Sequence, residues 1–148
     1  MTLLGKLGSD LPSRYYLGVD VGYKEHVAVA ISLKTFLRGD DRWKRAQCVH
    51  FPSTQAGLRK LQKYLDRLSA DPTEFFGLCE PTGGYYGASV FQCLLDRQYD
   101  MNLVENATVS HMRKQLFPSL PKTDEMDCRV MARIGYLHEM VGEEFTIR

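Results

Sequence analysis

Four acidic side chains stand at points where an apolar run ends or a helix begins. They are Asp20, Glu80, Asp124 and Asp127. Asp20 and Glu80 each close an apolar run and precede turn residues, whereas the other two acids lie three apart at the start of an amphipathic segment. An acid at the carboxyl end of a buried strand points into the crevice where open α/β sheets bind ligands. Four carboxylates gathered there would hold metal ions and act on phosphate.

Phosphodiester chemistry gives a reason to place four acids together. Two Mg²⁺ ions about 3.5–4 Å apart can activate a nucleophile and hold the leaving oxygen. Mg²⁺ prefers oxygen ligands and keeps several waters, so a few carboxylates suffice for each ion. Without cations the four acids would repel one another, and some would take up protons. The cluster therefore predicts a divalent metal site, with two ions of Mg²⁺ or Mn²⁺.

The spacing of the last two acids places them on one side of a helix. At about 100° per residue, Asp124 and Asp127 are separated by about 60°. A neighbouring apolar stripe would dock this helix on a sheet; it consists of Met126, Val130, Ile134, Leu137 and Val141. We therefore expect Asp127 to border the stripe and Asp124 to lie one turn nearer the solvent.

Each acid also has a simpler explanation when it is considered alone. An aspartate after a strand is commonly a turn or cap residue, and Asp124 could serve only the helix N-terminus. Two acids at the ends of adjacent strands, together with an i, i+3 pair on a docked helix, are a more specific pattern. This conjunction favours the metal site.

The elements that must position these acids begin with strands. Residues 15–20 form an apolar run, and apolar side chains alternate with smaller ones over residues 26–33, so each segment predicts a strand. Residues 46–51 predict a third strand. Residues 34–45 are rich in charge and contain Gly39, so we expect a loop or a hairpin tip there. Three successive strands joined by short connections predict an antiparallel meander.

Helices and strands then alternate along the chain. The predicted elements are a helix from residue 53 or 54 to about 70, a strand over 73–79, a helix over 83–97, a strand over 101–104, and helices over 107–117 and 123–141. Their order is that of an α/β, ribonuclease H-like domain with a mixed five-stranded sheet and helices on both faces. Its parallel strands must connect through right-handed crossovers.

Length and composition set the limits of this prediction. The chain has 148 residues, which suits one domain, and its formal net charge of +1 does not by itself favour nucleic acid. No apolar run approaches the roughly 20 residues of a membrane helix, and the N-terminus lacks the apolar core of a signal peptide. We therefore expect a cytoplasmic protein with no membrane partner, with a tail over 1–14, one domain over 15–141 and the start of a linker over 142–148.

Two basic clusters leave two interpretations open. One is Lys34, Arg38, Arg42, Lys44 and Arg45; the other is Arg59, Lys60, Lys63 and Arg67. Each can be the solvated face of a loop or helix, or a surface that contacts phosphate.

Three short motifs together resemble a known family. They are Leu17–Gly22, Glu80–Tyr85 and Lys122–Asp127. In order and spacing they resemble the DEDD transposases of insertion sequences, of the IS110 group and related to the Piv DNA invertase, over residues 15–137.

The resemblance implies a RuvC-like domain whose catalytic and metal-binding tetrad is Asp20, Glu80, Asp124 and Asp127. It implies DNA as the partner, a structured guide RNA in some members, and a homo-oligomer for the full-length protein. Family members carry a nucleophilic serine on a second, C-terminal domain. We therefore expect this chain to correspond to the N-terminal part of a transposase or site-specific recombinase and to be inactive in isolation.

Four basic residues are the candidates for contact with the nucleic-acid backbone. Many members of the family have a lysine soon after the first motif, and Lys24 stands near that position here, after Tyr23. Arg113, Lys114 and Lys122 flank the proposed metal site in the sequence.

Three rival functions are compatible with the same residues. The first is a RuvC-like nuclease that cuts Holliday junctions or other branched DNA without a serine. The second is an actin-like nucleotide-binding domain, although the further glycine motifs of that superfamily are absent from the sequence. The third is a non-catalytic nucleic-acid-binding or assembly module with a vestigial tetrad.

Overall fold

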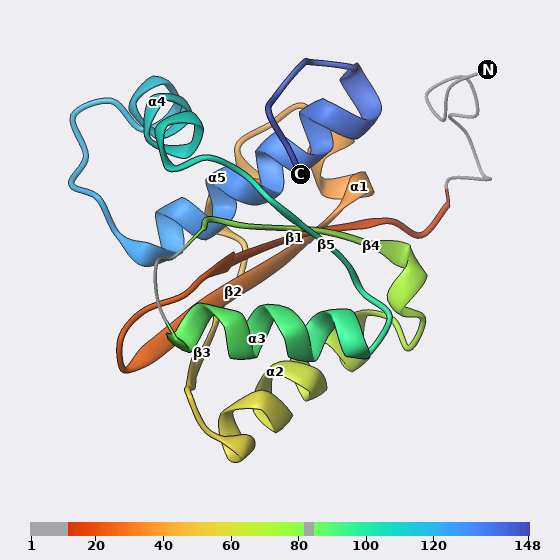
Figure 1. Ribbon diagram of the computed structural model, residues 1–148. Helices are drawn as coiled ribbons and strands as arrows, with labels where there is room; N and C mark the ends of the chain where they lie inside the picture. The colour runs from red at the N-terminus through yellow and green to blue at the C-terminus, as the bar shows by residue number, and fades with distance from the viewer. Residues whose placement is uncertain (1–11, 82–84) are drawn as a thin grey trace.

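One mixed sheet organises the computed structural model, which describes residues 12–81 and 85–148, without the side chains of residues 85–88. Its strands are β1 (Tyr15–Asp20), β2 (Glu25–Ser32), β3 (Val49–Pro52), β4 (Phe75–Cys79) and β5 (Asp100–Leu103). The strand order is β3-β2-β1-β4-β5 (Figure 1). Strands β1, β2 and β3 pair antiparallel, whereas β1, β4 and β5 pair parallel. The predicted meander and the mixed five-stranded sheet are confirmed.

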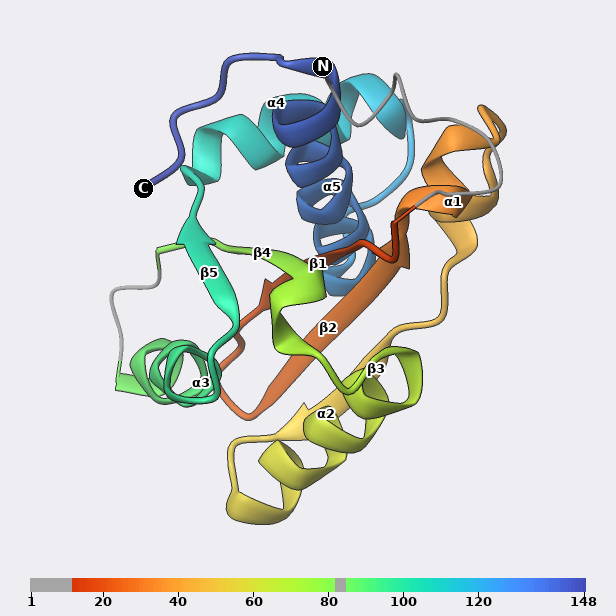
Figure 2. The same ribbon diagram turned by 90° about the vertical axis from the view of Figure 1, so that its right-hand side faces the viewer.

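Helices cover both faces of this sheet (Figures 1 and 2). They are α1 (Leu33–Leu37), α2 (Gln55–Leu68), α3 (Tyr85–Asp96), α4 (Asn106–Leu116) and α5 (Asp124–Tyr136). Helices α2 and α3 enclose one hydrophobic cluster with the sheet, and α1, α4 and α5 enclose another on the opposite face. The predicted ribonuclease H-like arrangement, with helices on both faces, is confirmed.

The segment over residues 34–45 differs from its prediction as a loop. It contains α1 and a 3₁₀ turn that includes Trp43. The Ser32 hydroxyl caps α1 by accepting a hydrogen bond from the backbone N–H of Thr35 at 3.2 Å. Leu33, Phe36 and Trp43 are buried, and their burial stabilises helical turns within a segment that is otherwise charged.

The final helix is shorter than predicted. Helix α5 ends at Tyr136, and the chain continues as a π-helical turn over Leu137–Val141. Gly142 follows with φ of 82°, a left-handed conformation that glycine adopts without strain and that ends the helical segment.

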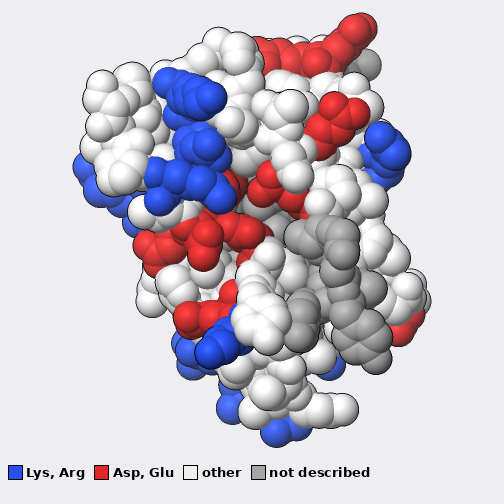
Figure 3. Space-filling model, turned by 60° about the vertical axis from the view of Figure 1, so that its left-hand side comes forward, with Lys and Arg blue, Asp and Glu red and all other residues white. Residues whose placement is uncertain are grey.

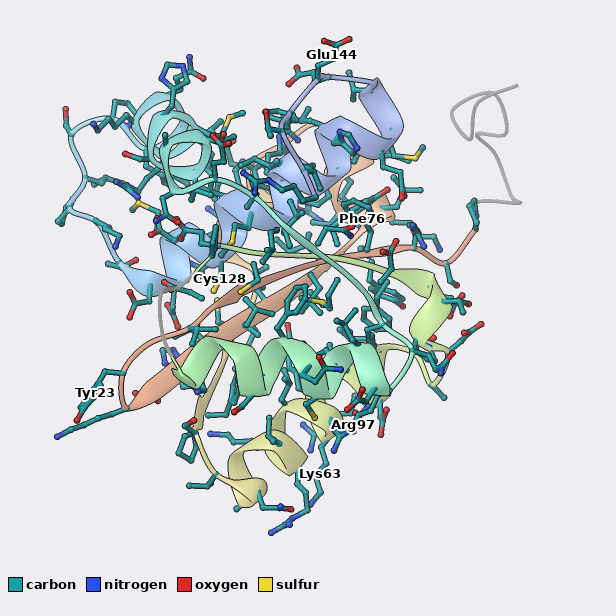
Figure 4. All side chains as sticks on the ribbon, viewed as in Figure 1. Tyr23, Lys63, Phe76, Arg97, Cys128 and Glu144 are labelled. Atoms are coloured by element: carbon teal, nitrogen blue, oxygen red, sulfur yellow. The ribbon has the colours of Figure 1, made fainter. Side chains whose placement is uncertain are left out.

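Helix α5 lies close against β1 at Gly18. A Cβ atom at this position would overlap the carbonyl oxygen of Cys128, so only glycine permits the approach. The Cys128 thiol, labelled in Figure 4, donates a hydrogen bond to the carbonyl oxygen of Val27 on β2 at 3.1 Å. Because side chains alternate along a strand, Gly18 and Asp20 face the same side. The contact at Gly18 therefore fixes α5 over the end of β1.

The C-terminal residues return to the sheet beside β5. Val104 and Ile147 form an antiparallel bridge, and the backbones of Leu103 and Arg148 exchange hydrogen bonds of 2.9 and 3.0 Å. The division into a tail over 1–14, a domain and a linker over 142–148 stays a prediction. Residues 1–11 of that tail, and residues 82–84 of the Glu80 motif, lie outside the described residues. None of the described helices is long and apolar enough to cross a membrane.

Candidate metal centre

Parallel pairing of β1 with β4 brings the first two acids to one edge of the sheet. Asp20 is the last residue of β1, Glu80 directly follows β4, and the preceding residues Val19 and Cys79 are partners in the register. Asp124 begins α5, whose first turn is capped by the Thr123 hydroxyl, which accepts a hydrogen bond from the N–H of Met126 at 3.1 Å.

The four predicted acids influence one another electrostatically. Burial, followed by the negative charges of Asp124, Asp127 and Glu80, raises the pKa of Asp20 to about 7. The pKa of Glu80 is also raised, first by burial and then by the charge of Asp127. Acidic side chains gather on one face of the molecule with lysine and arginine side chains beside them (Figure 3). The structure thus places the four predicted acids near enough to influence one another electrostatically, and their role as a site stays a prediction.

Asp127 is a buried carboxylate with two cationic partners. Its side chain is only 2% exposed. Arg113 Nη1 lies 2.8 Å from Asp127 Oδ1, and Lys122 Nζ lies 3.5 Å from Oδ2. Arg113 also donates a hydrogen bond to the Ser110 hydroxyl at 3.3 Å. Helix α4 and the linker after it therefore each supply a cation to the acid on α5.

These contacts place two of the four residues predicted to bind nucleic acid inside the acidic site. Arg113 is largely buried there, whereas the Lys122 side chain is 58% exposed. Lys24, in the turn between β1 and β2, and Lys114, in the last turn of α4, are both exposed. The contact of all four with a nucleic-acid backbone stays a prediction.

Asp20 supplies the observation that best fits a cation. Its Oδ2 atom is buried and has no hydrogen-bond partner among the described residues. A buried carboxylate oxygen without a partner is costly, and a metal ion would satisfy it. The gathered donors are all carboxylates, which suit hard cations such as Mg²⁺ or Mn²⁺.

Within the described residues, no group of three or more His, Cys, Asp or Glu side chains already has the geometry of a metal site. Both Asp127 oxygens face Arg113 and Lys122 instead. The identity of the ion and the full ligand set therefore stay predictions.

The turn that follows Asp20 is held by a buried histidine. The backbone N–H of Gly22 donates to Nδ1 of His26 at 3.2 Å, and the ring packs against Phe51 at 5.3 Å between centroids. Burial lowers the pKa of His26, which favours the neutral ring that can accept this bond. His26 therefore fixes the backbone directly after Asp20.

Three residues beside the site, His50, Glu25 and Glu125, form contacts that no sequence pattern predicts. His50 on β3 places Nε2 2.7 Å from Oε2 of Glu125 and Nδ1 3.5 Å from Oε1 of Glu25. They come from β3, α5 and β2, and only the folded sheet brings them together. His50 thereby connects the edge strand to the helix that carries Asp124.

Comparison with known protein families gives one finding that covers most of the chain. A family model for DEDD transposases of the IS110 type, described as a transposase, matches residues 17–143. The matched range contains all four acids of the candidate site. No curated protein matches the chain.

Proposed function

Because the chain belongs to the IS110-type DEDD transposases, we propose that residues 15–141 form the metal-binding catalytic domain with which a DNA transposase cleaves and exchanges strands. The observation that carries this proposal is the buried, unpartnered Oδ2 of Asp20 beside three further acids. Arg113 and Lys122 compensate the charge of Asp127, and cations bound among the other acids would relieve their mutual repulsion.

Four residues would hold the ions in this proposal: Asp20, Glu80, Asp124 and Asp127. The bound Mg²⁺ or Mn²⁺ ions, two in number, would supply Lewis-acid activation of the scissile phosphate. Asp20 and Glu80 are carried by neighbouring strands of a hydrogen-bonded sheet, so their backbones are rigidly spaced. The acids of α5 are held against these strands by the close contact at Gly18.

Arg113 and Lys122 would make this acidic site approachable for DNA. Four carboxylates in one site would repel a phosphodiester, and two cations in contact with Asp127 reduce that repulsion. The rigid bond from Arg113 also orients the Asp127 carboxylate. Lys122 reaches the solvent and could contact a phosphate that approaches the site.

Further properties follow from membership of the family and are part of the proposal. DNA is the proposed substrate, and a structured guide RNA and a homo-oligomer are the proposed further elements of the complete system in the cytoplasm. From the resemblance we expect the nucleophilic serine to lie on a second domain. We therefore expect residues 15–141 to bind metal without exchanging strands by themselves.

Calorimetric titration of Mn²⁺ tests the metal site directly. Wild type should bind Mn²⁺, and Asp20→Ala should lose most of that binding because it removes the buried oxygen. Asp66→Ala, which removes an exposed acid on α2, is the matched control and should bind as wild type does. Equal Mn²⁺ binding by wild type and Asp20→Ala would contradict the assignment.

Four-way DNA junctions distinguish the transposase from a RuvC-like nuclease. A junction-cutting enzyme needs no second domain, so metal-dependent cleavage by this chain alone would favour the nuclease. Binding of metal without cleavage supports the transposase domain.

A further inference from the structure

A basic hollow lies between the edge strand β3 and helix α2. It occupies about 390 Å³ between the segment before and within β3 and helix α2. Three of its lining residues are cations, namely Lys60, Lys63 and Arg67, and none is an acid. We call this hollow the β3–α2 groove.

The three cations share one face of α2. They stand at positions i, i+3 and i+7, which project from one side of a helix. The other side of α2 is buried through Leu61 and Leu65. This periodicity aligns the positive charges along the groove and leaves the apolar stripe to hold the helix on the sheet.

The groove has rigid walls. A Cβ atom at Gly57 would overlap the carbonyl oxygen of Pro52, so α2 lies directly against the end of β3. The Tyr64 hydroxyl donates to the carbonyl oxygen of Gln47 at 2.9 Å and accepts from the N–H of Ala30 at 3.0 Å. Strand and helix therefore hold the groove open without a ligand to order it.

The cations of the groove are not neutralised. In the part of the chain that the structure describes, Lys60, Lys63 and Arg67 are exposed and none is within ion-pair distance of a carboxylate. Lys63 extends from α2 away from the sheet (Figure 4). By contrast, Arg42 and Lys44 in the other basic cluster each pair with an aspartate. The positive field of the groove is therefore available to an anionic partner.

One end of the groove lies beside the first turn of α5. His50 lines the groove, and its Nε2 contacts the carboxylate of Glu125, the residue after Asp124. An extended polyanion in the groove would therefore lead towards the tetrad.

We propose that Lys60, Lys63 and Arg67 bind the sugar-phosphate backbone of DNA that flanks the site of cleavage. The identification of the partner as DNA rests on the proposed function, whereas the anion-binding groove rests on its own geometry. Two of the three cations are lysines, whose ammonium groups are point charges on flexible stems and suit phosphates better than base edges. The contact is therefore independent of DNA sequence.

Fluorescence anisotropy with a short labelled duplex of arbitrary sequence tests this proposal on the 148-residue chain. The test variant is Lys60→Gln/Lys63→Gln/Arg67→Gln. Its matched control, Lys34→Gln/Arg38→Gln/Arg45→Gln, removes the same charge from exposed residues of the other basic cluster. We expect the groove variant to bind about tenfold more weakly near 0.1 M salt and the control to stay within about twofold of wild type.

Salt dependence gives a second measurement of the same contact. Between about 50 and 200 mM KCl, the slope of log affinity against log salt should be shallower by about 2–3 in the groove variant, one unit for each lost phosphate contact. A slope equal to that of wild type, or an equal loss in the control, would overturn the proposal. If both variants have the melting temperature of wild type, a loss of DNA affinity is not caused by unfolding.

Two further measurements distinguish DNA binding in the groove from RNA binding and from the proposed metal site. Duplex RNA should compete less well than duplex DNA, because its A-form helix spaces the phosphates differently along the groove. Equal competition by the two duplexes would overturn the assignment to DNA. Mn²⁺ titration of the groove variant should match wild type. If wild type binds no Mn²⁺ but the groove variant still loses DNA affinity, the metal site fails and the groove stands. If Mn²⁺ binds but wild type binds no DNA, the groove fails and the metal site stands.

Discussion

At the scale of single residues, the Asp127 carboxylate combines deep burial with full charge compensation. A buried carboxylate needs partners that replace its hydration, and Arg113 and Lys122 contact one oxygen each. The two contacts are unequal, because the Arg113 bond is short and largely buried whereas Lys122 is longer and more exposed.

Replacement of Arg113 by Gln should destabilise the fold by about 3 kcal/mol, because it leaves a buried charge with only the distant Lys122 as partner. Lys114→Gln, an exposed change in the same turn of α4, should stay within about 0.5 kcal/mol of wild type. Urea denaturation measures both free energies of unfolding. A cost for Arg113→Gln as small as that of the control would show that Asp127 does not depend on this bond.

Asp20 should make the stability of the metal-free chain depend on pH. Its folded pKa of about 7 is above its ordinary value of 3.8, so the folded chain binds this proton more tightly than the unfolded chain does. The free energy of unfolding should therefore fall as pH rises from about 4 to about 7 and then level off.

In Asp20→Asn, the free energy of unfolding should lack the fall that deprotonation of Asp20 causes. The variant should therefore become more stable relative to wild type as pH rises. Urea denaturation in EDTA at a series of pH values measures the difference, and Asp66→Asn is the exposed control. Parallel curves for wild type and Asp20→Asn would show that Asp20 is not held in its neutral form by the fold.

At the scale of elements, the contact between α5 and β1 determines whether the acids meet. Gly18→Ala should destabilise the fold by about 1–3 kcal/mol, because its methyl group would overlap the rigid backbone at Cys128. It should also weaken Mn²⁺ binding by moving α5 away from Asp20. Gly77→Ala on β4 is the control, because the closest atoms to its methyl group would be at the flexible end of Met101, and the nearest backbone atom, the Asp100 carbonyl oxygen, is 3.3 Å away. Unchanged Mn²⁺ affinity in Gly18→Ala would show that the contact between α5 and β1 does not position the acids of the metal site.

The sequence predicted elements best where local and tertiary preferences agree. Strand β1 was predicted to the residue because an apolar run ends at Asp20 before a turn, and the cap of α2, Thr54, is one of the two positions offered for the start of that helix. Helix α1 was missed because its buried residues, such as Phe36, are few and stand among charges. The family resemblance and the strand-end positions identified the four acids. The contacts of His50 could not be foreseen, because three distant elements must fold before they exist.

At the scale of the whole molecule, a bound metal ion should stabilise the entire domain. Ligands that bind only the folded state add about 2.7 kcal/mol at a concentration one hundred times the dissociation constant. For a chain of this size that corresponds to a rise in melting temperature of about 5–10 °C. Differential scanning fluorimetry should record this rise for wild type with Mn²⁺ and no comparable rise for Asp20→Ala. Equal shifts in both proteins would indicate binding elsewhere.

The position of α5 in the chain has a consequence for folding during synthesis. Asp124 stands 104 positions after Asp20, and α5 covers one face of β1, β2 and β4. Until α5 has been made, apolar residues on that face, including Tyr16 and Val29, lack the main helix that covers them. Such long-range contacts fold slowly and leave apolar surface exposed in the meantime. The same order of synthesis means that an incomplete chain lacks Asp124 and Asp127, so the acidic site can form only after most of the domain has been translated.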